Sequence, residues 1–182
     1  AGDTALTTDQ RGIARPQGAG CDIGAFESQG FTLTYGGGSA QRTLVNTPFA
    51  NPLRLTVSSS AGEPVDGGRV IFTGPTNGAG LSSSPLMATI SGGTVSQAVT
   101  ANATSGSYVV TATTRGALSS AISYSLTNAK MSVIGNAHPI DDGDTSPTTE
   151  DHTDFGTLAL GQSLTRTFTI RNSGTADLSL TG

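Results

Sequence analysis

The chain of 182 residues carries a formal net charge of −4, and only 12% of its residues are charged. This charge argues against a nucleic-acid partner, which would require a basic patch. The single cysteine, Cys21, excludes an internal disulfide framework, and no apolar run approaches the roughly 18 residues of a membrane-spanning helix. Ser and Thr number 49 and Gly 25, and apolar residues come in short β-branched bursts, which together predict an all-β protein.

The distribution of charge and the pattern of residue types divide the chain into three parts, residues 1–29, 30–128 and 129–182. The first part holds two Arg and four acidic residues, the second four Arg and two acidic residues, and the third three basic and seven acidic residues. We therefore place domain boundaries near Gly30 and Asn128. The total length suits one or two small domains.

The first part contains three dense motifs: residues 9–12 (Asp-Gln-Arg-Gly), 15–18 (Arg-Pro-Gln-Gly) and 21–27 (Cys-Asp-Ile-Gly-Ala-Phe-Glu). In this order they resemble the closing segment of right-handed parallel β-helix domains in bacterial surface proteins, the choice-of-anchor Q group. The resemblance implies that residues 1–29 are the C-terminal end of a β-helix. We therefore expect the chain to be a piece of a much longer protein.

Four charged residues in this part, Arg11, Arg15, Asp22 and Glu27, invite a catalytic interpretation. The structural interpretation is stronger, because the arginines can pair with the acids or bind backbone carbonyls and so close the last coil. The positions expected to pack inside that coil are Cys21, Ile23 and Phe26.

The second part alternates apolar and polar residues in short runs, as expected of strands with one face on a core. The runs are residues 31–35, 53–57, 69–73, 95–100, 108–113 and 122–126. Turn-forming residues separate them at 36–38, 51–52, 62–64, 66–68, 92–93 and 105–106. This spacing predicts an immunoglobulin-like β-sandwich over residues 30–128.

A more specific likeness covers the same part. Sequence motifs of bacterial Ig-like domains of the invasin and intimin type are similar to residues 49–53, 55–57, 62–65, 70–72 and 106–112 of this chain. Ser58, Ser59 and Ser60 depart from that pattern. The resemblance implies a fold more than a ligand. Tyr108 is expected to bury its ring and direct its hydroxyl to the backbone. The other aromatic residues expected in the core are Phe31, Phe49 and Phe72.

The third part predicts strands at residues 131–135 and 164–172, and the start of another at 178–180. Residues 153–156 and 167–176 resemble the choice-of-anchor D domain, a second Ig-like type. Because only 54 residues are present, about half a sandwich, we expect a truncated domain with an exposed edge and incomplete order. An exposed edge favours self-association.

An acidic loop in this part is the one candidate site. Its six carboxylates could supply oxygen ligands for Ca²⁺. They are Asp141, Asp142, Asp144, Glu150, Asp151 and Asp154. The EF-hand spacing is not met, because Gly143 stands in the wrong place, and a solvated acidic loop is the favoured interpretation.

Other chemistry lacks support in the sequence. His138 and His152 are too far apart for the usual zinc ligand pairs, and no G-x-S-x-G elbow or phosphate-cradling loop occurs. Asn102 heads a formal glycosylation sequon that we attribute to chance. We expect no enzyme activity and no cofactor, with calcium the single alternative.

The sequence therefore predicts a non-enzymatic structural spacer in a secreted or cell-surface bacterial protein, with a contribution to adhesion left open. Its expected partners are other domains of the same chain, with glycans or matrix and surface proteins as further candidates. The alternative is a carbohydrate-binding appendage of a β-helix polysaccharide-processing enzyme. The absence of Trp and the presence of only three Tyr count against that alternative.

Overall fold

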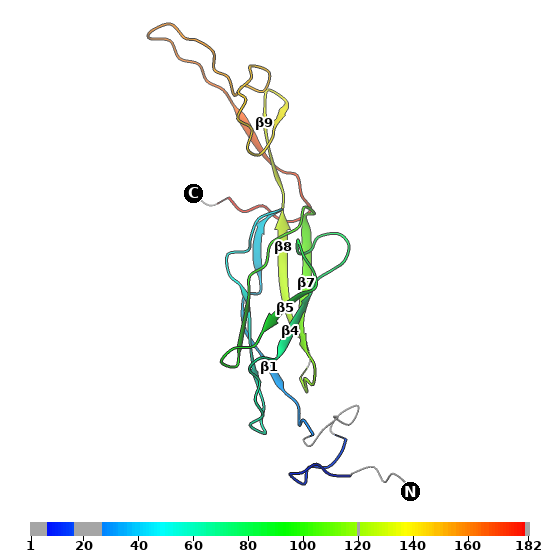
Figure 1. Cartoon of the computed structure of the whole chain (residues 1–182). Coiled ribbons are helices and arrows are strands. Elements are labelled where there is room, and N and C mark those ends of the chain that lie inside the picture. Colours follow the sequence, from blue (N-terminus) through cyan, green and yellow to red (C-terminus); the bar gives the residue numbers. More distant parts are fainter. Residues whose placement is uncertain (1–6, 17–26, 120, 181–182) are drawn as a thin grey trace.

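The computed structural model describes residues 7–16, 27–119 and 121–180, and these form eleven β-strands and no helix. The prediction of an all-β protein with a β-sandwich is thus confirmed. The described residues accordingly include no helix that could cross a membrane. The molecule is elongated, with the N-terminal segment, the sandwich and the C-terminal segment following one another along its long axis (Figure 1).

The sandwich consists of two sheets. The first contains β1 (Thr32–Gly37), β3 (Leu53–Ser58) and β6 (Thr94–Gln97) in that order. The second has the order β2 (Gln41–Leu44), β8 (Ile122–Ala129), β7 (Gly106–Thr114), β4 (Arg69–Thr73) and β5 (Leu86–Thr89). Neighbouring strands are antiparallel, except that β2 runs parallel to β8.

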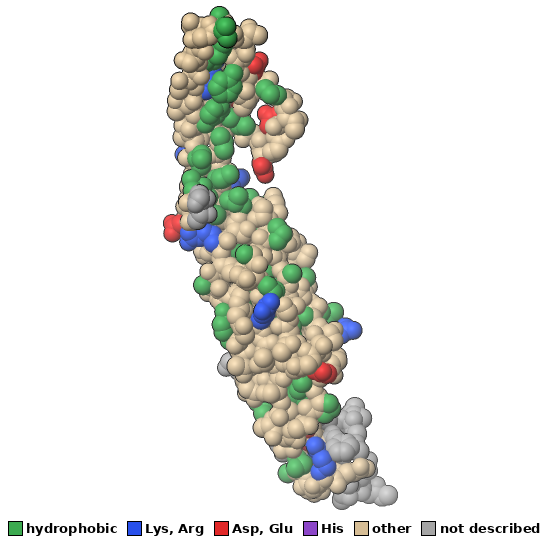
Figure 2. Space-filling view, turned by 90° about the vertical axis from the view of Figure 1, so that its left-hand side faces the viewer, with side chains coloured by type: hydrophobic (Ala, Val, Ile, Leu, Met, Phe, Trp, Pro, Cys, Tyr) green, Lys and Arg blue, Asp and Glu red, His purple; other side chains and the backbone are tan. Residues whose placement is uncertain are grey.

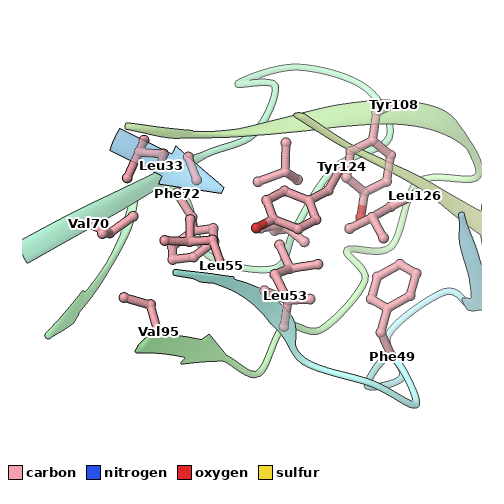
Figure 3. Close-up of a cluster of buried hydrophobic side chains, with 14 of the residues drawn as sticks. Leu33, Phe49, Leu53, Leu55, Val70, Phe72, Val95, Tyr108, Tyr124 and Leu126 are labelled. Atoms are coloured by element: carbon pink, nitrogen blue, oxygen red, sulfur yellow. The ribbon is translucent and has the colours of Figure 1, made fainter. Parts of the chain in front are cut away.

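Alternation along the strands builds the core between the two sheets. In β3 every second residue, Leu53, Leu55 and Val57, is buried, while the residues between them are exposed. All three belong to the core cluster, and Figure 3 shows Leu53 and Leu55 facing the fully buried Phe72 of β4 and Tyr124 of β8 across the sandwich. Burial of these apolar surfaces is the main force that holds the two sheets together.

The remaining three strands form a separate small sheet in the order β10 (His138–Ile140), β9 (Met131–Gly135) and β11 (Phe168–Asn172). Only Lys130 separates β9 from the end of β8, so one extended segment runs from the sandwich into this sheet (Figure 1). Residues 127–129, at the boundary expected near Asn128, belong to β8 itself, and Asn128 and Ala129 are buried.

The structure agrees with most predicted strands and corrects others. Strands β4 and β9 have the predicted bounds, and Phe49, Phe72 and Tyr108 are buried as expected, whereas Phe31 is only partly buried. Strands β2, β5 and β10 were not predicted. Residues 178–180 form no strand, and β11 begins at Phe168 rather than at residue 164.

The turn predicted at residues 36–38 is shorter in the structure. Strand β1 continues through Gly37 with a bulge after Tyr35 and ends before Gly38. Gly38 has a φ of +93°, and a Cβ at this position would collide with the carbonyl oxygen of Pro52. Glycine is therefore required here both by conformation and by space.

Candidate functional site

The six carboxylates of the acidic loop do not come together. Asp141, Asp142, Asp144 and Glu150 are exposed, Asp154 is partly exposed, and Asp151 is buried. Among residues 7–16, 27–119 and 121–180, no three His, Cys, Asp or Glu side chains form a group that could hold a metal ion. A thermal-shift measurement with calcium and with chelator tests the calcium alternative.

Asp151 is the buried member of the set. Its Oδ1 accepts hydrogen bonds from the hydroxyl of Thr153 at 2.6 Å and from the backbone N–H of Thr153 at 3.0 Å. These bonds outweigh the effect of burial and lower the pKa of Asp151 to about 2. The carbonyl of Asp151 lies so close to Gly135 of β9 that a Cβ there would collide with it. Asp151 thus anchors the loop against the small sheet.

Other loop carboxylates also bond within the loop or beside it. Asp144 Oδ1 accepts a hydrogen bond from the N–H of Ser146 at 2.8 Å, and Asp154 Oδ1 one from the N–H of Gly156 at 2.8 Å. His138 Nδ1 lies 3.6 Å from Glu150 Oε1, which joins the loop to β10. Each carboxylate described here therefore closes a local turn or contact.

The N-terminal segment is built around Asp9. Its carboxylate accepts hydrogen bonds from the backbone N–H groups of Arg11, Ile13 and Glu27 at 2.7–3.0 Å, and from the Arg11 guanidinium at 2.8 and 2.9 Å. Burial acts to raise the pKa of Asp9, but the bonds from Glu27, Ile13 and Arg11 together hold it well below its usual range. Asp9 was not singled out in the sequence, although an acid that closes an Asx-type turn is a recognisable signal.

The predicted charge partners in this segment are partly observed. Arg15 Nε lies 3.7 Å from Glu27 Oε2, and Arg11 donates to the backbone carbonyl of Glu27. Asp22, together with Cys21, Ile23 and Phe26, lies outside the described residues. Two of the expected contacts, a pair between Arg and acid and a bond to a carbonyl, therefore occur among the residues the structure describes.

Glu63 joins the N-terminal segment to the sandwich. One carboxylate oxygen accepts a hydrogen bond from the Ser28 hydroxyl at 3.0 Å, and the other accepts one from the N–H of Gln29 at 3.1 Å. Arg11 Nη1 lies 3.5 Å from the same carboxylate. The sequence predicts only a turn at residues 62–64, because the partners of Glu63 lie 34 residues or more away in the chain.

The opposite end of the sandwich contacts the C-terminal segment. The turn after β11 donates two backbone hydrogen bonds, from Ser173 and Gly174, to the carbonyl of Lys130 at 3.0 and 3.1 Å. The hydroxyl of Thr175 donates to the carbonyl of Ser105 at 3.3 Å. The small sheet is thus tied to the sandwich through this turn as well as through the continuous strand.

Asn102, the sequon residue, has a structural role at the same end. Its Oδ1 accepts hydrogen bonds from the N–H groups of Gly80 and Thr104 and from the side chain of the buried Asn128. Its side-chain nitrogen donates to the carbonyl of Gly78 at 2.9 Å. A glycan on this nitrogen would compete with these contacts.

The three tyrosines offer little stacking surface. Tyr108 and Tyr124 are buried, and only Tyr35 is exposed, at 50%. The hydroxyl of Tyr35 accepts a hydrogen bond from the N–H of Ser39 at 3.0 Å. A flat aromatic platform of the kind that binds sugars is therefore not built from the described tyrosines.

Comparison of the chain with family models, with curated proteins and with solved structures gave no match. A function proposed for this chain accordingly rests on its own residues and their arrangement.

Proposed function

We propose that the chain is a non-enzymatic structural spacer of a secreted or cell-surface bacterial protein, and that it holds neighbouring domains apart. The observation that carries this proposal is that the sandwich is bonded to flanking segments at its two opposite ends. Glu63 forms the contact at one end, and Ser105 and Lys130 form it at the other. Such contacts restrict the swing of one module on the next, as a spacer requires.

We further propose that the sandwich is Ig-like and that it is followed by the beginning of a second such domain. Strand order supports the first part: β1, β3 and β6 share one sheet, and β4, β7 and β8 share the other. Strands A, B and E and strands C, F and G divide in this way in immunoglobulin sandwiches. The flanking likenesses to choice-of-anchor Q and choice-of-anchor D domains belong to this proposal on their sequence motifs alone.

The small sheet of β10, β9 and β11 has an exposed apolar face, which supports the proposal that residues 129–182 are only the beginning of a second sandwich. Pairing register places Val133, Ile140, Ile170 and Phe168 on one face of the small sheet. Phe168 and Ile170 are 39% and 52% exposed, and Figure 2 shows hydrophobic side chains gathered in a band over this end of the molecule. The equivalent inward positions of the complete sandwich, such as Leu55 of β3, are almost fully buried.

The spacer proposal can be tested by spin-label distance measurements across each end of the sandwich. Labels on Gln10 and Ser123 span the first contact, and labels on Ser123 and Thr169 span the second, in a Cys21→Ser background; all three label positions are exposed. Narrow distance distributions are expected for both pairs. Broad distance distributions in protein that keeps both contacts would mean that the modules move freely, and would contradict the spacer role.

The carbohydrate-binding alternative has its own test. Binding of the chain to a glycan array, with calcium and with chelator, is expected to show no saturable signal. Saturable binding to one glycan class would favour the alternative, and loss of that binding with chelator would point to the acidic loop.

A further inference from the structure

A pocket lies at the end of the sandwich where the second sheet meets the loop that carries Glu63. Its volume is about 540 Å³, within the range of roughly 300–1,000 Å³ of ligand-binding pockets. Its apolar lining includes Phe31, Pro64, Val65, Ile71, Met87 and Ile90. None of the structural contacts described above uses the exposed part of this surface.

Two apolar side chains of the pocket lie open to solvent on the outer face of the second sheet. Met87 is 61% exposed and Ile71 is 39% exposed, and the two residues are directly paired across β5 and β4. Large apolar groups side by side on an exposed sheet face are unusual in a chain whose outer positions are mostly Ser and Thr. They form an apolar row that a ligand could cover.

The next row of the same face is cationic. Arg69, the first residue of β4, pairs with Thr89 of β5. Because Val70 pairs with Thr114, the last residue of β7, the following Arg115 lies next to Arg69 across the two strands. Both arginines line the pocket, and neither forms an ion pair with a described residue. Like charges at neighbouring positions repel each other, so an anion placed between them is favoured.

The one acid among the residues that line the pocket already accepts other hydrogen bonds. Asp66 lines the pocket, but its two carboxylate oxygens accept hydrogen bonds from the N–H groups of Gly92 and Gly93 at 2.9 and 2.8 Å. It therefore fixes the turn between β5 and β6 and makes no ion pair with either arginine. The two guanidinium groups remain available to an external carboxylate.

Strand β5 adds the third element. It is the edge of the second sheet, so its outer side carries no hydrogen-bonded strand among the described residues. An edge strand can accept an extended peptide as an added strand. Residues two apart in such a peptide point to the same face, so one would lie beside Met87 and the other beside Thr89, with Arg69 one strand further along the same row.

We propose that this pocket binds an acidic peptide segment that pairs with β5 and presents an apolar residue and, two positions away, a carboxylate. The apolar side chain covers Ile71 and Met87, and the carboxylate pairs with Arg69 and Arg115. A peptide is favoured over an acidic sugar because the lining is mainly aliphatic, whereas sugars need many polar partners. The inference goes beyond the spacer role and does not depend on it.

The test uses a fluorescein-labelled peptide in which Val and Glu stand two residues apart, and fluorescence anisotropy with the full chain. The matched control peptide has the same composition with Val and Glu adjacent, so that they point to opposite faces of a strand. We expect saturable binding of the first peptide and weaker binding of the control. Replacement of Glu by Lys, or methylation of the peptide's pairing N–H groups, should abolish binding.

Protein variants locate the site. Arg69→Gln and Arg115→Gln are each expected to weaken binding about tenfold, the effect of losing one charged hydrogen bond. Arg54→Gln is the matched control, because Arg54 is exposed on β3 and does not line the pocket. In methyl-labelled protein, the Met87 signal should shift on peptide addition while the other methionine, Met131, should not.

Three outcomes would overturn the proposal. They are equal binding of the Glu and Lys peptides, unchanged binding by both pocket arginine variants, and binding of polygalacturonate in place of peptide. Absence of binding by every probe, in protein whose circular dichroism shows a folded sandwich, would also reject it.

Discussion

The hydroxyl of Tyr124 donates a 2.8 Å hydrogen bond to the backbone carbonyl of Arg54 and so connects the two sheets of the sandwich. Tyr124 lies on β8 of the second sheet, and Arg54 lies on β3 of the first. The Tyr124 ring is fully buried and tilts against Phe72 at a centroid distance of 6.1 Å. The expectation that Tyr108 would make such a backbone bond was wrong, because its buried hydroxyl forms no hydrogen bond with a described residue.

This difference between two buried tyrosines leads to a paired prediction. Tyr124→Phe should lower the free energy of unfolding by about 1–2 kcal/mol, because it removes the buried hydrogen bond between the two sheets. Tyr108→Phe should change it by less than about 0.5 kcal/mol or raise it, because the hydroxyl it removes forms no such bond. Urea unfolding of both variants measures the difference, and a larger loss in Tyr108→Phe would contradict the assignment.

Alkaline pH should destabilise the sandwich through the same two residues. Burial raises the pKa of Tyr124 and of Tyr108 to about 12, from an ordinary value of 10.0, although the nearby Asn128 side chain partly offsets the shift at Tyr108. The folded state therefore retains protons that the unfolded state loses, so stability is present below pH 10 and declines as pH rises to 12. Melting temperatures from pH 9 to 12 should show this decline. It should flatten in the double Phe variant, and an equal decline in that variant would exclude the tyrosines as its cause.

Calcium should leave the melting temperature of the chain unchanged relative to chelator. The carboxylate of Asp151 accepts two hydrogen bonds from Thr153, and those of Asp144 and Asp154 each accept a hydrogen bond from a backbone N–H of their own loop. A calcium-dependent rise in melting temperature that Asp144→Asn removes would instead establish the site that the sequence suggested.

The C-terminal sheet should promote self-association. Ile170 lies on its apolar face and is 52% exposed, while the adjacent Thr169 points to the opposite face. Sedimentation velocity over a range of concentrations should show a mass that rises with concentration in the unmodified chain. Ile170→Lys should suppress this rise and Thr169→Lys should not. A monomer at every concentration would refute the expected association.

Strands could be predicted where alternation was strict. The run Arg69–Thr73 has the bounds of β4, which buries alternate residues. The run Met131–Gly135 has the bounds of β9, where the β-branched Val133 and Ile134 favour a strand. Strand β2 could not be foreseen, because its four residues have no such pattern and its parallel partner β8 begins about 80 residues later. Strand β10 follows a two-residue turn in which Asn136 and Ala137 both have positive φ, and Ala is an unusual residue there.

Contacts of the site were less predictable than strands. The role of Glu63 depends on Ser28 and Gln29, which approach it only once β1 and β3 have paired. The arginine pair of the pocket likewise depends on the register of β4 with β7, which the sequence alone does not specify. The six acids of the loop, by contrast, were easy to find as a cluster, yet their neighbourhood in sequence did not bring their side chains together.

Small-angle X-ray scattering of the monomeric fraction can show whether the contacts at both ends hold the chain extended. We expect a scattering curve that fits the single extended arrangement of Figure 1, and a broader ensemble in Glu63→Ala, which removes the contact at the N-terminal end. A curve that requires compact conformers in the unmodified chain, or one that Glu63→Ala leaves unchanged, would contradict it.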